Sequence, residues 1–267
     1  MAESFREIGP GLFWLGDCLK FEYGQEIWHG HVSTYLVIGD ERTLLLDTGH
    51  PSHWDAVEPA LDALLGDRPL DLVLPTHPEM PHAGNLPKLA RKYTGLTVVG
   101  DTRDYHLYYP EIADRLAPTP VGERIDLGGR EIHVLPAIWR DLPNTVWAFD
   151  SASGVMFVAD GFSYSHHHLA GECRLYSSEL PQAPDLEQTV FLNERALFWT
   201  RHVDSEHTEP DLESLFKRYS PTLVAPAHGS VIDGLDEMVA LLKAGMAESR
   251  KQNTVVAARW APTDGAR

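Results

Sequence analysis

The sequence predicts a single α/β domain in which short apolar strands are followed by amphipathic helices, twice over along the chain. Residues 70–74 form an apolar run bounded by two prolines, which is typical of a buried strand. Residues 53–65 place apolar side chains at helical spacing. No linker, repeat or low-complexity segment divides the chain, so we expect one domain over residues 1–267, with a disordered tail beyond about residue 253.

The remaining elements follow from the same patterns. Alternating apolar residues and glycine-rich breaks between residues 5 and 47 predict antiparallel strands joined by a hairpin. Further apolar runs predict strands at 96–100, 130–138, 145–150, 155–160 and 222–228. Helical spacing predicts helices at 85–92, 185–203, 209–219 and 234–250.

Composition and charge exclude several classes of protein. The formal net charge of −17 would repel phosphate backbones, so neither nucleic acid nor an anionic membrane is an expected partner. The chain has no apolar run long enough to span a bilayer, and its first residues are acidic where a signal peptide would be basic. We therefore expect a cytoplasmic protein. Cys18 and Cys173 lie far apart in the sequence and are interpreted as two reduced thiols.

The stretch THPEMPHAGN, residues 76–85, is the strongest functional signal. It places His77, Glu79 and His82 directly after the buried strand at 70–74. Loops at strand ends often carry chemistry because a rigid sheet positions them. Taken alone, the cluster is either a solvated polar turn or a metal site. Other metal-capable residues follow predicted strands in the same way, namely Asp141, Asp160 and His228.

These motifs resemble the metallo-β-lactamase superfamily over residues 5–228. The usual superfamily motif is His-x-His-x-Asp-His, and Glu79 stands where the second histidine would be, as in the diiron branch that includes the flavodiiron proteins. The resemblance implies a four-layer αββα sandwich. It also implies that Asp47, in the segment LLLDTGH, is a turn or supporting residue and not a ligand.

The same resemblance implies a complete ligand set. One metal would be held by His77, Glu79, Asp141 and the bridging Asp160, and a second by His82, His228 and the same Asp160. Three carboxylates and three imidazoles suit iron better than zinc, so two iron ions are expected, with manganese or zinc as alternatives. Pro81 departs from the pattern, because superfamily members carry a metal-binding aspartate there. Its loss weakens the second metal site and the case for hydrolysis.

Two further histidines are predicted to line the pocket. His29 lies in a segment resembling one that reaches over the metals in flavodiiron proteins, and His166 begins a run of three histidines. His166 belongs to the long polar stretch 161–183, which we expect to cover the site. We assign both His29 and His166 as candidate catalytic residues.

Three functions are compatible with these features. The first is a non-haem diiron oxidoreductase that activates or reduces dioxygen, such as an oxygenase or oxidase of a small organic substrate. We expect the flavodoxin domain of flavodiiron proteins to be absent, so electrons would come from a partner protein or from the substrate. The second is a metal-dependent hydrolase of an ester, lactone or phosphodiester. The third is a non-catalytic sensor of O2 or NO. A homodimer is compatible with each.

Overall fold

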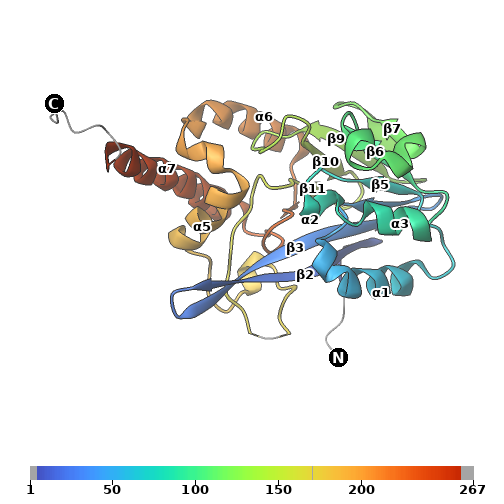
Figure 1. Ribbon diagram of the computed structural model, residues 1–267, viewed down its shortest axis with the longest axis horizontal. Coiled ribbons are helices and arrows are strands. Elements are labelled where there is room, and N and C mark those ends of the chain that lie inside the picture. The colour runs from blue at the N-terminus through green and yellow to red at the C-terminus, as the bar shows by residue number, and fades with distance from the viewer. Residues whose placement is uncertain (1–4, 170, 260–267) are drawn as a thin grey trace, which may run out of the picture.

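Two β-sheets pack face to face, and helices cover the outer face of each (Figure 1). The computed structural model describes residues 5–169 and 171–259. The two sheets and their helices form the four-layer αββα sandwich, which confirms the predicted fold class.

The first sheet has seven strands in the order β1-β2-β3-β4-β5-β6-β7. Strands β1 to β4 pair antiparallel, whereas β4 to β7 pair parallel because helices connect them. The strands span Arg6–Gly9, Leu12–Tyr23, Glu26–Ile38, Thr43–Leu46, Leu72–Leu74, Thr97–Gly100 and Leu116–Pro118.

The second sheet has five strands in the order β12-β11-β10-β9-β8. Only β11 and β12 pair parallel, and the other neighbours are antiparallel. Strands β8 to β12 span Arg124–Asp126, Glu131–Pro136, Val146–Asp150, Val155–Phe157 and Leu223–Ala225.

The outer helices pack against the two sheets through apolar side chains. α1, α2 and α3 lie beside the first sheet, while α5, α6 and α7 lie beside the second (Figure 1). The α-helices α1 to α7 span Trp54–Leu65, Met80–Ala83, Leu86–Lys92, Tyr105–Tyr108, Leu186–Ala196, Glu209–Tyr219 and Leu235–Arg259. The 3-10 segments η1 to η5 span Pro51–His53, Pro110–Arg115, Ser177–Glu179, Phe198–Arg201 and Ser205–Thr208.

The core between the sheets is apolar and closely packed. Tyr35 of β3 and Phe157 of β11 face each other across it with ring centroids 5.1 Å apart. The hydroxyl of Tyr35 donates a hydrogen bond to the carbonyl of Pro226 at 2.7 Å, so the one polar group of this ring is satisfied although the ring is buried. The contact joins the two sheets beside the loop that carries His228.

The β2–β3 hairpin is longer than the sheet to which it belongs. β3 pairs with β2 from Glu26 onward, but β4 begins to pair only at Tyr35. The hairpin therefore extends past the other strands, as the blue ribbon at the lower left of Figure 1 shows. Where β4 does not cover the edge of β3, two loops pair with it instead. The isolated bridges join Val32 to His228 and His29 to His166. These bridges position the loops that follow β11 and β12.

Several boundaries differ from the sequence-based expectation, and the strand predicted at 222–228 ends at Ala225. The strand predicted at 155–160 ends at Phe157, and the helix predicted at 185–203 ends at Ala196 and is followed by η4. Helix α7 continues past residue 253 to Arg259, since no proline interrupts the chain between Leu235 and Pro262. The rest of the tail, residues 260–267, lies outside the described residues. Within the described residues, no helix is both long and apolar enough to cross a membrane.

Candidate metal centre

Loops from both sheets meet at one end of the sandwich. His77 follows β5, His82 lies in the short helix α2, and Asp141 lies between β9 and β10. Asp160 follows β11, and His228 follows β12. The structure thus brings together all six predicted ligands, which are His77, Glu79, His82, Asp141, Asp160 and His228.

Asp160 lies at the centre of this group. Its Oδ1 is 3.3 Å from Nε2 of His82 and 3.3 Å from Nε2 of His228. Its Oδ2 is 3.7 Å from Nε2 of His77. The two carboxylate oxygens thus face different histidines, which is the arrangement that a bridging carboxylate requires.

The other two carboxylates surround His77. Nε2 of His77 lies 3.7 Å from Oδ2 of Asp141 and 3.9 Å from Oε2 of Glu79. Asp141 is nearly buried, whereas the side chain of Glu79 is 48% exposed. The Glu79 carboxylate therefore forms the solvent-facing wall of the group.

Several polar atoms in this group are buried without a hydrogen-bond partner. They include Nε2 of His77, Nε2 of His82 and Oδ1 of Asp160. Buried polar atoms are normally satisfied, because leaving one unpaired costs about 1–3 kcal/mol. Here Nε2 of His82 faces Oδ1 of Asp160 at 3.3 Å, and Nε2 of His77 faces carboxylate oxygens of Asp160 and Glu79 at 3.7 and 3.9 Å. A shared cation would satisfy all of them, so the residues fit a metal ion.

The carboxylate of Asp47 contacts Nδ1 of His82, the ring nitrogen that does not face Asp160. Oδ2 of Asp47 is 3.0 Å from Nδ1 of His82, and Oδ1 accepts hydrogen bonds from the backbone and hydroxyl of Thr76 at 2.7 and 2.9 Å. A carboxylate at Nδ1 directs Nε2 of the same ring towards a metal. Asp47 adopts the left-handed conformation, with a φ of 56°. The predicted supporting position of Asp47 matches this geometry, whereas nothing in the sequence analysis singled out Thr76.

The carboxylates differ in their electrostatic environment. Burial alone would raise the pKa of Asp160, but His82 and His228 outweigh it and hold that pKa well below its usual range. The neighbouring His77 ring lowers the pKa of Glu79. Burial raises the pKa of Asp141. The neighbouring histidines therefore favour the ionised form of Asp160, which is the form that a bridging ligand needs.

His29 and His166 lie in a second histidine cluster along the β2–β3 hairpin. Their backbones form a bridge, with hydrogen bonds of 2.8 and 2.9 Å between them. The ring of His29 packs against that of His168 at a tilt of 41°, with centroids 3.9 Å apart. Both ring nitrogens of His166 are buried without a hydrogen-bond partner. The catalytic assignment of His29 and His166 stays a prediction.

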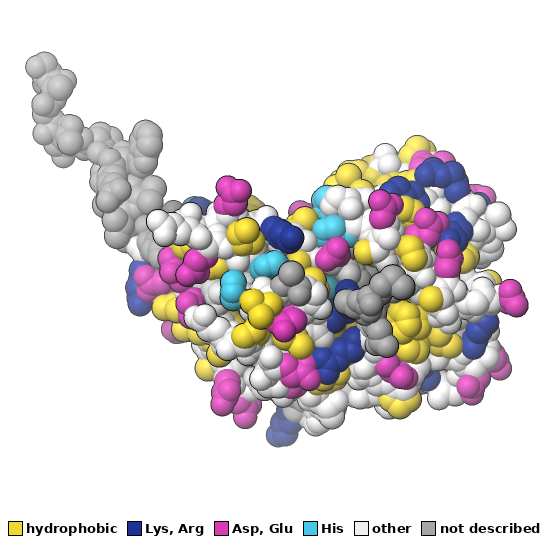
Figure 2. Space-filling view, turned by 90° about the horizontal axis from the view of Figure 1, so that it is seen from below, with side chains coloured by type: hydrophobic (Ala, Val, Ile, Leu, Met, Phe, Trp, Pro, Cys, Tyr) yellow, Lys and Arg dark blue, Asp and Glu magenta, His cyan; other side chains and the backbone are white. Residues whose placement is uncertain are grey.

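The stretch after Asp160 folds against the protein. Most residues from 161 to 168 are buried, and the backbone of Ser165 donates to the carbonyl of Gln188. Figure 2 shows histidine side chains reaching the surface near a hollow on one face, among scattered acidic, basic and hydrophobic side chains.

Comparisons with known proteins place the chain among related sequences and structures. Residues 27–179 match the model of the metallo-β-lactamase superfamily. The coenzyme F420H(2) oxidase of Methanocaldococcus jannaschii is 25% identical over 174 residues, covering 58% of this chain and 40% of that protein. The enzyme of the same name from Methanothermobacter thermautotrophicus is 27% identical over 200 residues, covering 68% of this chain and 46% of that protein. The chain thus spans less than half the length of these curated relatives.

Solved structures share the fold at lower identity. Rubredoxin oxygen:oxidoreductase from Desulfovibrio gigas superposes with a TM-score of 0.71 at 16% identity, covering 92% of this chain and 61% of that one. The flavodiiron protein from Giardia intestinalis superposes with a TM-score of 0.70 at 15% identity, covering 96% of this chain and 60% of that one.

Proposed function

Since the chain belongs to the metallo-β-lactamase superfamily, we propose that it is a non-haem diiron oxidoreductase that reduces or activates dioxygen. The observation that carries this proposal is the convergence of His77, His82 and Asp160, whose unpaired buried atoms face one another. Two relatives named as oxidases of a reduced coenzyme give the proposal its reaction class.

We assign the ligands from these distances. His77, Glu79, Asp141 and one oxygen of Asp160 would hold the first ion, while His82, His228 and the other oxygen of Asp160 would hold the second. Oxygen and imidazole ligands suit iron or manganese, and two histidines with one carboxylate leave coordination positions open. Iron is therefore the proposed metal. The whole chain, residues 1–267, is proposed to form the single domain around it.

The protein's own groups define how such a centre would work. Iron bound here would supply the electron transfer to oxygen that side chains cannot perform. Asp47 fixes the orientation of His82, and the buried walls around Asp160 keep bulk water away from it. Glu79 lies on the exposed side, so solvent reaches the centre past its carboxylate. Oxygen reduction consumes protons, and solvent can deliver them from this side.

The electron donor is proposed to be a separate molecule. The relatives' names specify a reduced coenzyme and rubredoxin as donors to those proteins. For this chain we propose a small carrier protein or an oxidisable organic substrate. The net charge of −17 favours a donor with a basic contact face. A cytoplasmic location and a homodimer remain part of the same proposal.

Oxygen consumption by iron-loaded protein tests the proposal. The protein is purified without oxygen, its metals are counted per chain, and oxygen uptake is followed with a chemical reductant. We expect iron in the protein and uptake that His77→Ala abolishes, while His106→Ala, the same change at an exposed histidine, leaves it intact. Hydrolysis of esters or phosphodiesters under nitrogen would overturn the proposal. Oxygen binding without turnover would instead indicate a sensor.

A further inference from the structure

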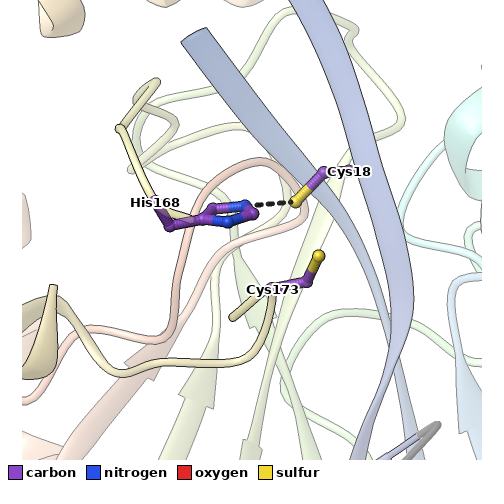
Figure 3. A group of neighbouring side chains, drawn as sticks. All are labelled: Cys18, His168 and Cys173. Atoms are coloured by element: carbon purple, nitrogen blue, oxygen red, sulfur yellow. Dashed lines mark hydrogen bonds between the residues drawn. The ribbon is translucent and has the colours of Figure 1, made fainter. Parts of the chain in front are cut away.

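A second group of metal-capable side chains lies between β2 and the loop that follows Asp160. It consists of Cys18, His168 and Cys173, whose ligand atoms all lie within 4.8 Å of one another. Figure 3 shows the three side chains pointing towards a common point, with Cys18 on the strand and the other two on the loop. Sγ of Cys18 is 3.2 Å from Nε2 of His168.

The fold holds the two sides of this group together independently of the side chains themselves. Nη1 of Arg174 donates to the carbonyl of Gly16 at 3.0 Å, which ties the loop to β2 next to Cys173 and Cys18. The backbone bridge between His29 and His166 fixes the same loop to β3. The two thiols therefore meet through tertiary structure although 155 positions separate them in the sequence (173 − 18).

The hydrogen bond of His168 prepares its ring for a metal. Nδ1 of His168 lies 2.7 Å from the carbonyl oxygen of Leu169, and a carbonyl can only accept, so Nδ1 carries the proton. In the neutral ring this leaves a lone pair on Nε2, the atom that faces Cys18. A backbone carbonyl at the outer nitrogen is the usual support of a metal-bound histidine.

We propose that Cys18, His168 and Cys173 form a second metal site that takes a borderline-soft ion such as Zn2+. Two thiolates and one imidazole are a zinc set that keeps a fourth position open, and thiolates select zinc or Cu(I) over the harder ions that suit carboxylates. On binding, the ion replaces the protons of both thiols, which are released to solvent. The ion then joins β2 to the loop that begins at Asp160.

A further buried histidine lies next to Cys18. His31 lies directly opposite Cys18 in the β2–β3 ladder, so their side chains share one face of the hairpin. Nε2 of His31 is buried without a hydrogen-bond partner. The ring of His31 thus shares a hairpin face with Cys18 but lies outside the three-residue group.

Cobalt substitution tests the site separately from the carboxylate-rich centre. Reduced protein, kept under nitrogen, is titrated with Co2+ and the near-ultraviolet absorption is recorded. Thiolate-to-cobalt charge transfer arises only from cysteine ligands, so the six-residue centre contributes nothing to it. We expect the band in wild type, in His77→Ala and in the neighbouring variant His167→Gln. We expect its loss in Cys173→Ser and at least a tenfold weaker affinity in His168→Gln.

Thiol reactivity in the unaltered protein gives a second measurement. Cys18 is buried, so its substitution can disturb folding, whereas alkylation of wild type needs no variant. Added Zn2+ should slow the alkylation of Cys173 at least tenfold. The proposal is overturned if Cys173→Ser keeps the charge-transfer band, or if a wild type with two titratable thiols lacks it.

Discussion

Oδ2 of Asp47 lies 3.0 Å from Nδ1 of His82, and this contact leaves Nε2 of His82 facing Asp160. The sequence places these two residues on separate strand connections, yet Thr76 binds Asp47 through its backbone and its hydroxyl and closes the arrangement. The orientation of one proposed ligand thus depends on a residue that does not reach the metal.

Asp47→Asn should weaken metal binding without unfolding the protein. Asparagine tolerates the left-handed backbone that Asp47 adopts, so the turn is preserved. The amide, however, replaces one acceptor oxygen that Thr76 and His82 need. We expect metal affinity to fall about 10–100-fold, measured by competition with a chelator. Asp71→Asn serves as the control, because Asp71 supports Thr43, away from the centre. Unchanged affinity in Asp47→Asn would remove Asp47 from the site.

Substitutions at the two ends of the centre should remove different ions. His77→Ala should lower the metal content at the first position and His228→Ala at the second, because each histidine faces a different oxygen of Asp160. Asp160→Ala should lower both. Elemental analysis of anaerobically purified protein measures these losses, with His106→Ala as the control. If neither His77→Ala nor His228→Ala changes the metal content, the ligand assignment is wrong.

The six-residue centre was predictable from the sequence, whereas the approach of Cys18 to Cys173 was not. His77, Glu79 and His82 lie within one stretch, and Asp160 and His228 each follow an apolar strand, so their meeting follows from the sandwich. Cys18 and Cys173 gave no such signal. Their approach depends on the excess length of the β2–β3 hairpin and on a loop that folds back across it. Neither property has a local pattern, so two separate thiols were predicted.

The histidine cluster along the hairpin should make the protein sensitive to acid. Burial lowers the pKa of His29 to about 4 and that of His166 to about 3, below the usual 6.5. Between about pH 6.5 and 4 the unfolded chain therefore binds protons that the folded protein does not, and stability falls as pH falls. Each histidine contributes a slope of about 1.4 kcal/mol per pH unit.

Urea unfolding at several pH values measures this effect. The double variant His29→Gln and His166→Gln should lose stability less steeply than wild type between pH 6.5 and 4. His106→Gln, at an exposed position, should follow wild type. Acid release of metal affects all three proteins, so only the difference in slope is informative. Equal slopes in the double variant and wild type would contradict the prediction.

Arg130 and Asp150 form a buried ion pair at the last residue of β10, away from the metal centre. Arg130 donates to both carboxylate oxygens of Asp150, at 3.1 and 2.5 Å, and to the carbonyl of Pro10 at 2.9 Å. Arg130→Met would leave the buried Asp150 charge uncompensated, so we expect a loss of about 3–5 kcal/mol in the free energy of unfolding. Arg124→Met, which breaks an exposed pair with Glu131, should cost less than about 1 kcal/mol. Comparable losses in the two variants would refute this account.

Pro81 stands where the superfamily motif has an aspartate. The structure places it in the first turn of α2, after the helix start at Met80. Backbone N–H groups in a first helical turn have no partner within the helix, so an aspartate there needs no rearrangement and is electrostatically favoured. Pro81→Asp should therefore fold normally. Its carboxylate should raise the affinity for the second ion, beside His82, by adding a ligand to the two histidines and one carboxylate proposed there.

The same substitution separates oxygen chemistry from hydrolysis. If the native reaction needs an open coordination position on the second ion, the added carboxylate should fill it, and oxygen uptake should fall while metal content rises. If the native reaction were hydrolysis, the added carboxylate would instead supply a base for water, and esterase or phosphodiesterase activity would rise. Pro81→Ala, which removes the ring without adding a ligand, controls for the loss of proline. Metal content and oxygen uptake are measured for wild type, Pro81→Asp and Pro81→Ala. Only an added ligand on the second ion should raise the metal content while lowering the oxygen uptake.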